Sequence, residues 1–112
     1  MKASASYQED LLQRLRDSKY AVGYLNAVLA DGDDGDFLLA LRDVAQVHGG
    51  LRQLASKAGV NREHLFRMLS KKGNPELHSL RQVVEALGFK LVLQRAAALK
   101  PKDGARARAR AG

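Results

Sequence analysis

Apolar side chains recur every three or four residues along most of this chain, the spacing of one face of an α-helix. The clearest stripe consists of Phe37, Leu38, Leu41, Val44 and Ala45, which fall on one side of a helix. The same pattern predicts helices over residues 7–16, 18–30, 35–48, 51–58, 62–72 and 80–87. The chain is therefore expected to fold as an all-α domain.

Residues that favour helix ends separate these segments. Asp17 or Ser18 is expected to cap the second helix and Asp33 or Asp34 the third, because short polar side chains accept backbone N–H groups there. Glycines at 49, 50 and 88 end helices, and Gly73–Pro75 is expected to be a loop. Ser79 is the expected cap of the last helix.

One segment alternates as a strand does. Phe89, Leu91 and Leu93 fall on one side of an extended chain, and no other convincing strand is predicted. A lone strand leaves backbone groups unpaired along both edges. We expect it to pair with its copy in a homodimer, with addition to another protein's sheet as the alternative.

Residues 51–69 carry the main functional signal. Two short predicted helices meet at a turn that contains Gly59, with Val60 filling the angle between them and Asn61 capping the second helix. Leu65, Met68 and Leu69 return the second helix to the core. This is the pattern of a helix-turn-helix, although an αα-hairpin with a basic exterior would produce it too.

The predicted second helix of this pair presents polar and basic side chains outward. In a DNA-binding helix-turn-helix its N-terminal residues face base edges in the major groove, where arginine reads guanine and glutamate accepts from cytosine. Neighbouring side chains are placed to contact phosphates. The candidate DNA-binding residues are Asn61, Arg62, Glu63, His64, Phe66, Arg67 and Lys71, flanked by Ser56, Lys57, Lys72 and Asn74.

The distribution of charge supports a polyanionic partner. Of the net charge of +7, residues 1–48 contribute −3 (5 Lys and Arg, 8 Asp and Glu) and residues 49–112 contribute +10 (14 against 4). The predicted helix-turn-helix lies in the basic half, which is the candidate nucleic-acid side. The tail residues Lys100, Lys102, Arg106, Arg108 and Arg110 are expected to form a non-specific electrostatic arm or to act only in solubility.

The sequence resembles a known family, the antidote (antitoxin) proteins of type II toxin–antitoxin modules. Within it, the resemblance is to the HigA-like helix-turn-helix group paired with RelE-like toxins. The resemblance spans residues 7–93. It is carried by Tyr24–Ala27, Phe37–Ala45, Gly49–Gly50, Leu54–Ala55 through Gly59, Arg62–Glu63 with Leu65 and Arg67, Leu69–Ser70, Gly73–Pro75 and Leu80–Gly88.

The resemblance implies a protein that neutralises a small basic ribonuclease toxin, represses its own operon and binds a palindromic operator as a dimer. The implied fold is all-α, a five- to six-helix lambda-repressor-like helix-turn-helix domain with a short C-terminal β-strand. His64 and Phe66 stand where the family more often has serine and tyrosine, which puts the base preference in question. The Arg-rich tail is an addition to the family pattern.

A second candidate surface lies on the two N-terminal helices. Tyr7, Leu11, Tyr20 and Tyr24, among acidic residues, form an amphipathic patch that suits a basic toxin. The competing interpretation is that these residues pack over the core.

Other functions find little support in the sequence. There is no cysteine, and the three histidines, His48, His64 and His78, lack partners at metal-binding spacing. The aspartates at 31–36 lack the glutamate of a calcium loop and are better explained as helix caps. No catalytic constellation, cofactor motif, signal peptide or membrane-spanning run is present, so we expect a cytoplasmic, non-enzymatic protein without cofactor or metal.

The expected organisation is a flexible arm over residues 1–6, a helix-turn-helix domain with an N-terminal helical extension over 7–95, and a basic disordered tail over 96–112. The leading alternative to an antitoxin is a stand-alone or phage-type repressor without a toxin partner. A small RNA-binding or nucleoid protein is the third possibility.

Overall fold

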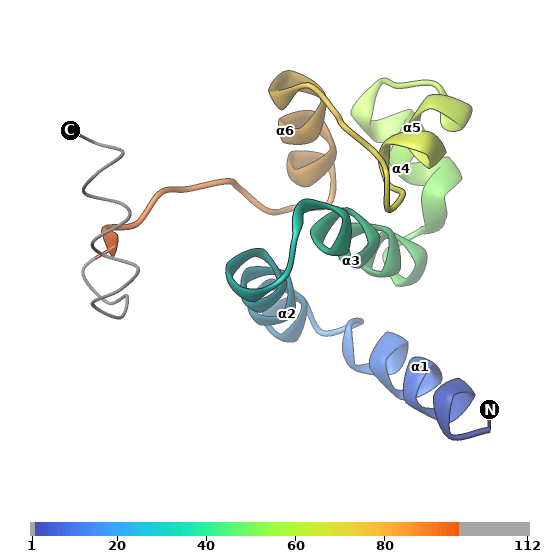
Figure 1. The fold of residues 1–112 in the computed structure, drawn as a ribbon. Helices are drawn as coiled ribbons and strands as arrows, with labels where there is room; N and C mark the ends of the chain where they lie inside the picture. The colour runs from blue at the N-terminus through green and yellow to red at the C-terminus, as the bar shows by residue number, and fades with distance from the viewer. Residues whose placement is uncertain (1, 97–112) are drawn as a thin grey trace.

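The computed structural model describes residues 2–96 of the chain, with side chains from residue 6 onward. This part of the chain is all-helical, as predicted, and contains six helices and no strand (Figure 1). They are α1 (Lys2–Arg14), α2 (Ser18–Asp31), α3 (Asp34–Val47), α4 (Gly50–Ala58), α5 (Arg62–Met68) and α6 (Leu77–Ala86).

Helix α3 lies at the centre of the fold. It packs against α1, α2 and α4, while α4 packs in turn against α5 and α6. In Figure 1, α1 projects from the side of the molecule opposite α6. The predicted stripe of α3 is buried along its whole length, and the core around it is made of leucine, valine and alanine from all six helices, with Phe37 and Met68 added. The largest fully buried side chains are Leu15, Leu41, Val44, Leu65, Leu69 and Val83.

Local capping explains where α2 and α3 begin. Asp17 caps α2 by accepting from the backbone N–H of Lys19 at 3.0 Å. Asp33 caps α3 through a reciprocal pair: its side chain accepts from the N–H of Asp36 at 2.8 Å, and the Asp36 carboxylate accepts from the N–H of Asp33 at 3.1 Å. Two otherwise unpaired helix N–H groups are thereby satisfied.

His48 fastens the end of α3 to the end of α1. It is the C-cap residue of α3, and its ring Nε2 lies 2.8 Å from the carbonyl oxygen of Leu15. With Nε2 protonated, the ring donates to a carbonyl that lies beyond the last residue of α1. This contact and the burial of Leu15 hold α1 on α3.

Three helix boundaries differ from the sequence prediction by three residues or more. Helix α1 begins at Lys2 rather than Tyr7, so the expected N-terminal arm is helical from that residue. Helix α6 begins at Leu77 behind Glu76, not behind Ser79. Helix α5 ends at Met68 rather than Lys72. Its end coincides with a competing local bond, because the Ser70 hydroxyl donates to the Arg67 carbonyl at 2.7 Å.

The early end of α5 places Lys71 against α3 rather than on an outward helical face. Its Nζ lies 2.6 Å from an oxygen of Asp36 and 3.7 Å from one of Asp33. The loop also approaches α3 closely at Gly35, where an added Cβ would collide with the Lys71 carbonyl. The prediction that Lys71 projects from the recognition helix is therefore wrong.

The segment predicted as a strand is extended but has no partner in the described chain. The N–H of Phe89 bonds the Val84 carbonyl at 3.1 Å, and residues 90–95 form no backbone hydrogen bond there. Phe89 packs against the core, while Leu91 is 39% and Leu93 100% exposed. Since a strand requires a second strand, its pairing stays a prediction. The proposed basic tail lies outside the described residues.

The core predicts that two leucines differ greatly in how much they stabilise the fold. Leu41 is fully buried in α3, whereas Leu29 on α2 is 50% exposed. We expect Leu41→Ala to lower the free energy of unfolding by about 2–5 kcal/mol, because it removes buried methyl groups and leaves a cavity. The matched control Leu29→Ala should cost about 1 kcal/mol or less. Urea unfolding at neutral pH measures both, and equal losses would contradict this core.

The Lys71 contact predicts a titration behaviour. The hydrogen bond from Lys71 is the main cause that lowers the pKa of Asp36 below its ordinary value of 3.8. Because the pKa is lowered, the ion pair stabilises the fold at pH values above the ordinary pKa of Asp36. This stabilisation is lost as the pH falls through the lowered pKa. In Lys71→Met, NMR titration of the Asp36 carboxyl should show a higher pKa than in the wild type. An unchanged pKa would contradict the pairing.

Candidate nucleic-acid interface

Helices α4 and α5 form a tight pair around a glycine turn. Gly59 has a φ of +72°, in the left-handed region where a side chain is strained, and the Val60 N–H bonds back to the Ala55 carbonyl at 3.0 Å. Asn61 then caps α5, its Oδ1 accepting from the His64 N–H at 3.1 Å. The turn glycine and the cap are both as predicted from the sequence.

One face of α5 is anchored in the core. Leu65, Met68 and the following Leu69 are all 4% exposed or less. Because this face is buried, the remaining side chains of the helix point to solvent. The predicted outward set on α5 is exposed: Arg62, Glu63, His64, Phe66 and Arg67.

The exposed face of α5 and the start of α4 enclose a shallow hollow. Its volume is about 560 Å³, and its lining consists of Leu51, Arg52, Arg62, Glu63, Phe66 and Arg67. Arg52 was not among the residues predicted for the interface. Its position in the first turn of a helix that precedes a glycine turn is the signal that identifies it.

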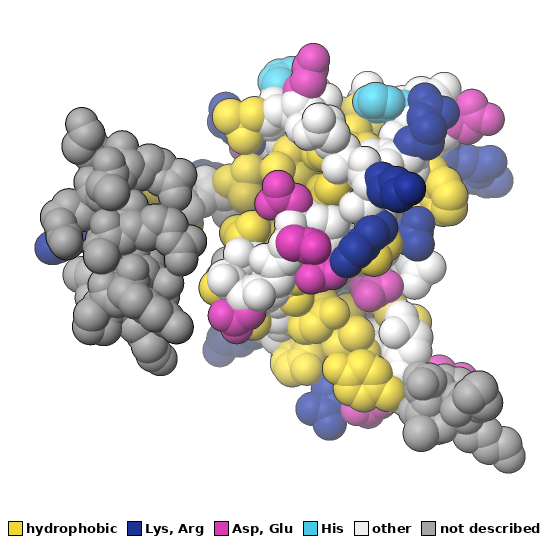
Figure 2. Space-filling model, in the orientation of Figure 1, with side chains coloured by type: hydrophobic (Ala, Val, Ile, Leu, Met, Phe, Trp, Pro, Cys, Tyr) yellow, Lys and Arg dark blue, Asp and Glu magenta, His cyan; other side chains and the backbone are white. Residues whose placement is uncertain are grey.

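The arginines of this hollow have no carboxylate partner among the described residues. Within residues 2–96, Arg52, Arg62 and Arg67 take part in no ion pair, whereas Lys71 is paired with two aspartates. On the face drawn in Figure 2, Lys and Arg side chains gather over the α4–α5 end of the molecule. The surface is therefore suited to an anion.

The predicted flanking residues lie in two places, the loop after α5 and the end of α4. A second hollow, of about 250 Å³, brings Lys72 and Asn74 next to His64 and Arg67. Ser56 and Lys57 are exposed near the end of α4. Every predicted interface residue is exposed around the same helix pair. Lys71 is exposed as well, but its charge is paired with Asp33 and Asp36.

The tyrosine patch on α1 and α2 is only partly a surface. Tyr7 is 69% and Tyr20 40% exposed, but Leu11 is 7% exposed and belongs to the core, so its placement on the patch was wrong. Tyr24 is half-buried beside a shallow hollow of about 510 Å³ whose lining includes Asp31, Asp36 and Asp43. Burial raises the pKa of both Tyr24 and Asp43 above their ordinary values.

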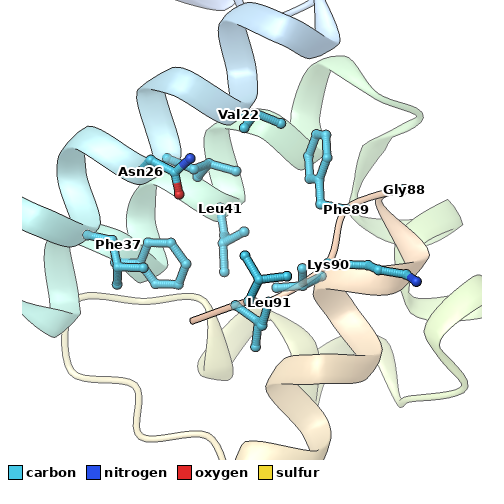
Figure 3. A pocket seen from close by; sticks show the side chains of 12 residues that line it. Val22, Asn26, Phe37, Leu41, Gly88, Phe89, Lys90 and Leu91 are labelled. Carbon is cyan, nitrogen blue, oxygen red and sulfur yellow. The ribbon is translucent and has the colours of Figure 1, made fainter. Parts of the chain in front are cut away.

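An apolar groove runs between α2, α3 and the extended C-terminal segment (Figure 3). Its volume is about 370 Å³. Phe37, Leu41, Phe89 and Leu91 are among the side chains around it. The predicted dimer strand therefore lies along the rim of an apolar hollow.

Two features are absent from the described residues, a cluster of metal ligands and a membrane-spanning helix. No three His, Asp or Glu side chains within residues 2–96 are grouped so that they would hold a metal ion. In the same part of the chain, no helix has the length and apolar character needed to cross a membrane.

The chain is similar to known proteins over most of its length. Residues 6–95 match the model of a family described as "probable addiction module antidote protein". A protein of Haemophilus influenzae (strain Rd) described as uncharacterized is 32% identical over 85 residues, which cover 76% of this chain and 87% of that protein. No solved structure gives a significant match. The chain thus belongs to the family of probable addiction module antidote proteins, which have the antitoxin role in a toxin–antitoxin module and a toxin as partner.

Proposed function

We propose that this protein is a sequence-specific DNA-binding antitoxin that neutralises a RelE-like ribonuclease toxin and represses its own operon. The observation that carries the DNA-binding part is the exposed face of α5, where Arg62 and Arg67 stand on a helix held by a glycine turn and are free of ion pairs within residues 2–96. Antidote proteins are in general not enzymes, which agrees with a binding function.

The shape of the helix pair favours major-groove binding. In a helix-turn-helix the second helix enters the groove with its N-terminal residues toward base edges, while the first crosses the backbone. Here α5 is the helix that enters the groove, with Arg62 and Glu63 in its first turn. Helix α4 is the one that crosses the backbone. Lys57, Lys72 and Asn74 then lie on the flanks, where phosphates run.

Charge supports the same orientation. Residues 49–96 carry nine Lys and Arg against three Asp and Glu, before the tail is counted. A basic surface draws DNA by releasing its counterions, and the base contacts of α5 add selectivity. The acidic side of the molecule, over α2 and the start of α3, faces a different partner in this proposal.

For the toxin we propose the exposed part of the N-terminal tyrosine patch. Tyr7 and Tyr20 present large amphipathic side chains, and the hollow beside Tyr24 carries three aspartates. A RelE-like toxin is basic, so its charge complements this side. Binding there leaves α5 available for DNA, which suits a toxin–antitoxin complex that also acts as repressor.

For the homodimer we propose pairing of the extended segments of two copies. Residues 90–95 have no backbone partner in the described chain, and Val92 and Leu93 are 74% and 100% exposed. Antiparallel pairing would satisfy these groups and cover the apolar side chains. A two-fold dimer of this kind matches a palindromic operator.

The competing function is a stand-alone repressor. It shares the α4–α5 interface but needs no partner at the tyrosine patch. A neighbouring gene for a small basic protein supports the antitoxin, and binding of that protein to this chain distinguishes the two directly.

The DNA interface is tested by titrating the protein with its own upstream DNA and with a scrambled duplex, at two salt concentrations. We expect the wild type to prefer the upstream DNA, because α5 reads base edges. The double variant Arg62→Ala/Arg67→Ala should lose the preference, with affinity reduced by about tenfold or more for each arginine.

The matched control is Arg14→Ala/Arg81→Ala, which removes the same charge at two arginines that pair with carboxylates on their own helices. It should keep the preference. Equal binding of both duplexes by the wild type, lost with salt and unaffected by Arg62→Ala/Arg67→Ala, would refute sequence-specific binding.

The toxin surface is tested with Tyr7→Ala/Tyr20→Ala. We expect this variant to bind the purified neighbouring toxin about tenfold or more weakly, because exposed tyrosines often anchor interfaces. Calorimetric titration gives the affinity, and Leu77→Ala, which alters a 67% exposed side chain on α6, serves as control. Unchanged affinity in the tyrosine variant would place the toxin elsewhere.

A further inference from the structure

Arg42 of α3 contacts the candidate interface from outside the helix pair. Its Cζ lies 5.1 Å from the centroid of the Phe66 ring on α5. This distance is within the range of a cation–π interaction, in which the ring face attracts the guanidinium. Arg42 is half-buried, while Phe66 remains 54% exposed, so the stacking leaves much of the ring open.

No carboxylate in the described part of the chain pairs with the guanidinium of Arg42. It takes part in no ion pair within residues 2–96, whereas Arg14 and Arg81 reach Asp10 and Glu85 at 3.1 and 3.7 Å. A guanidinium that stacks by its face keeps its N–H donors in the plane at its edge. Those donors are suited to a phosphate oxygen.

Phe66 is an unusual side chain for its surroundings. It lines the same hollow as Arg52, Arg62 and Arg67, so an exposed aromatic ring stands among three cations. On a helix that enters the major groove, an apolar side chain has a specific counterpart, the 5-methyl group of thymine. The arginines around the ring would then contact neighbouring phosphates and base edges.

We propose that Arg42 is a positioning residue of the DNA interface: it stacks on Phe66, holds the ring against a thymine methyl group, and hydrogen-bonds the adjacent phosphate. The inference rests on the proposed DNA binding. It adds to that binding a residue of α3 and a base that Phe66 prefers.

The test uses a duplex that the wild-type protein selects from a random-sequence pool. Each thymine is replaced in turn by uracil, which lacks only the 5-methyl group. We expect at least one replacement to weaken wild-type binding about fourfold, the effect of exposing one buried methyl group. Phe66→Ala should abolish this effect.

Arg42→Met keeps the apolar stem and removes the guanidinium. It should also lose the methyl effect, and the slope of log affinity against log salt should fall by about one because a phosphate contact is lost. Arg81→Met is the matched control and should retain the methyl effect and the slope. Thermal melting verifies that each variant is folded, and Arg42→Gln replaces Arg42→Met if the latter is not.

The remaining outcomes separate the two proposals. If Arg42→Met retains both the methyl effect and the salt slope, the role of Arg42 is refuted. If the wild type selects a duplex but no thymine replacement matters, the inference fails while sequence-specific binding stands. If no duplex is selected, sequence-specific binding and the inference fail together.

Discussion

The exposed face of α5 depends on the burial of its opposite face. A helix of seven residues has too few hydrogen bonds to be stable alone, so its shape comes from packing. Leu65, Met68 and Leu69 provide that packing in the core around α3. The Gly59 turn and the Asn61 cap set its starting point. The positions of Arg62 and Arg67 therefore follow from three buried side chains, one turn and one cap rather than from contacts of their own.

Two surfaces of opposite charge follow from the same arrangement. The α4–α5 side holds arginines without ion-pair partners in the described chain, and the side of α2 and the start of α3 holds aspartates. Lys71, in the loop after α5, connects the two sides through its ion pair with Asp36. In the proposed function, one of these sides binds DNA and the other binds a basic toxin, so the two partners need not compete.

The features that the sequence predicts correctly are local. Helical stripes, the Asp33 and Asn61 caps and the glycine turn involve residues within a few positions of each other, so spacing reveals them. Apart from the helix ends of α1, α5 and α6, the features that it misses are distant in sequence. Lys71 pairs with Asp36, 35 residues away, and Arg42 reaches Phe66 from another helix. Pairing of the extended segment at 89–93 requires a second chain, which a single chain leaves untested.

Hydroxyl-radical footprinting of the protein on its own upstream DNA tests the central claim, a dimer that places one α5 in each of two major grooves. Such a dimer should protect two segments on one face of the duplex, with centres about 10 base pairs, or one helical turn, apart. Protection that is uniform along the DNA, or that appears equally on a scrambled duplex, would contradict it.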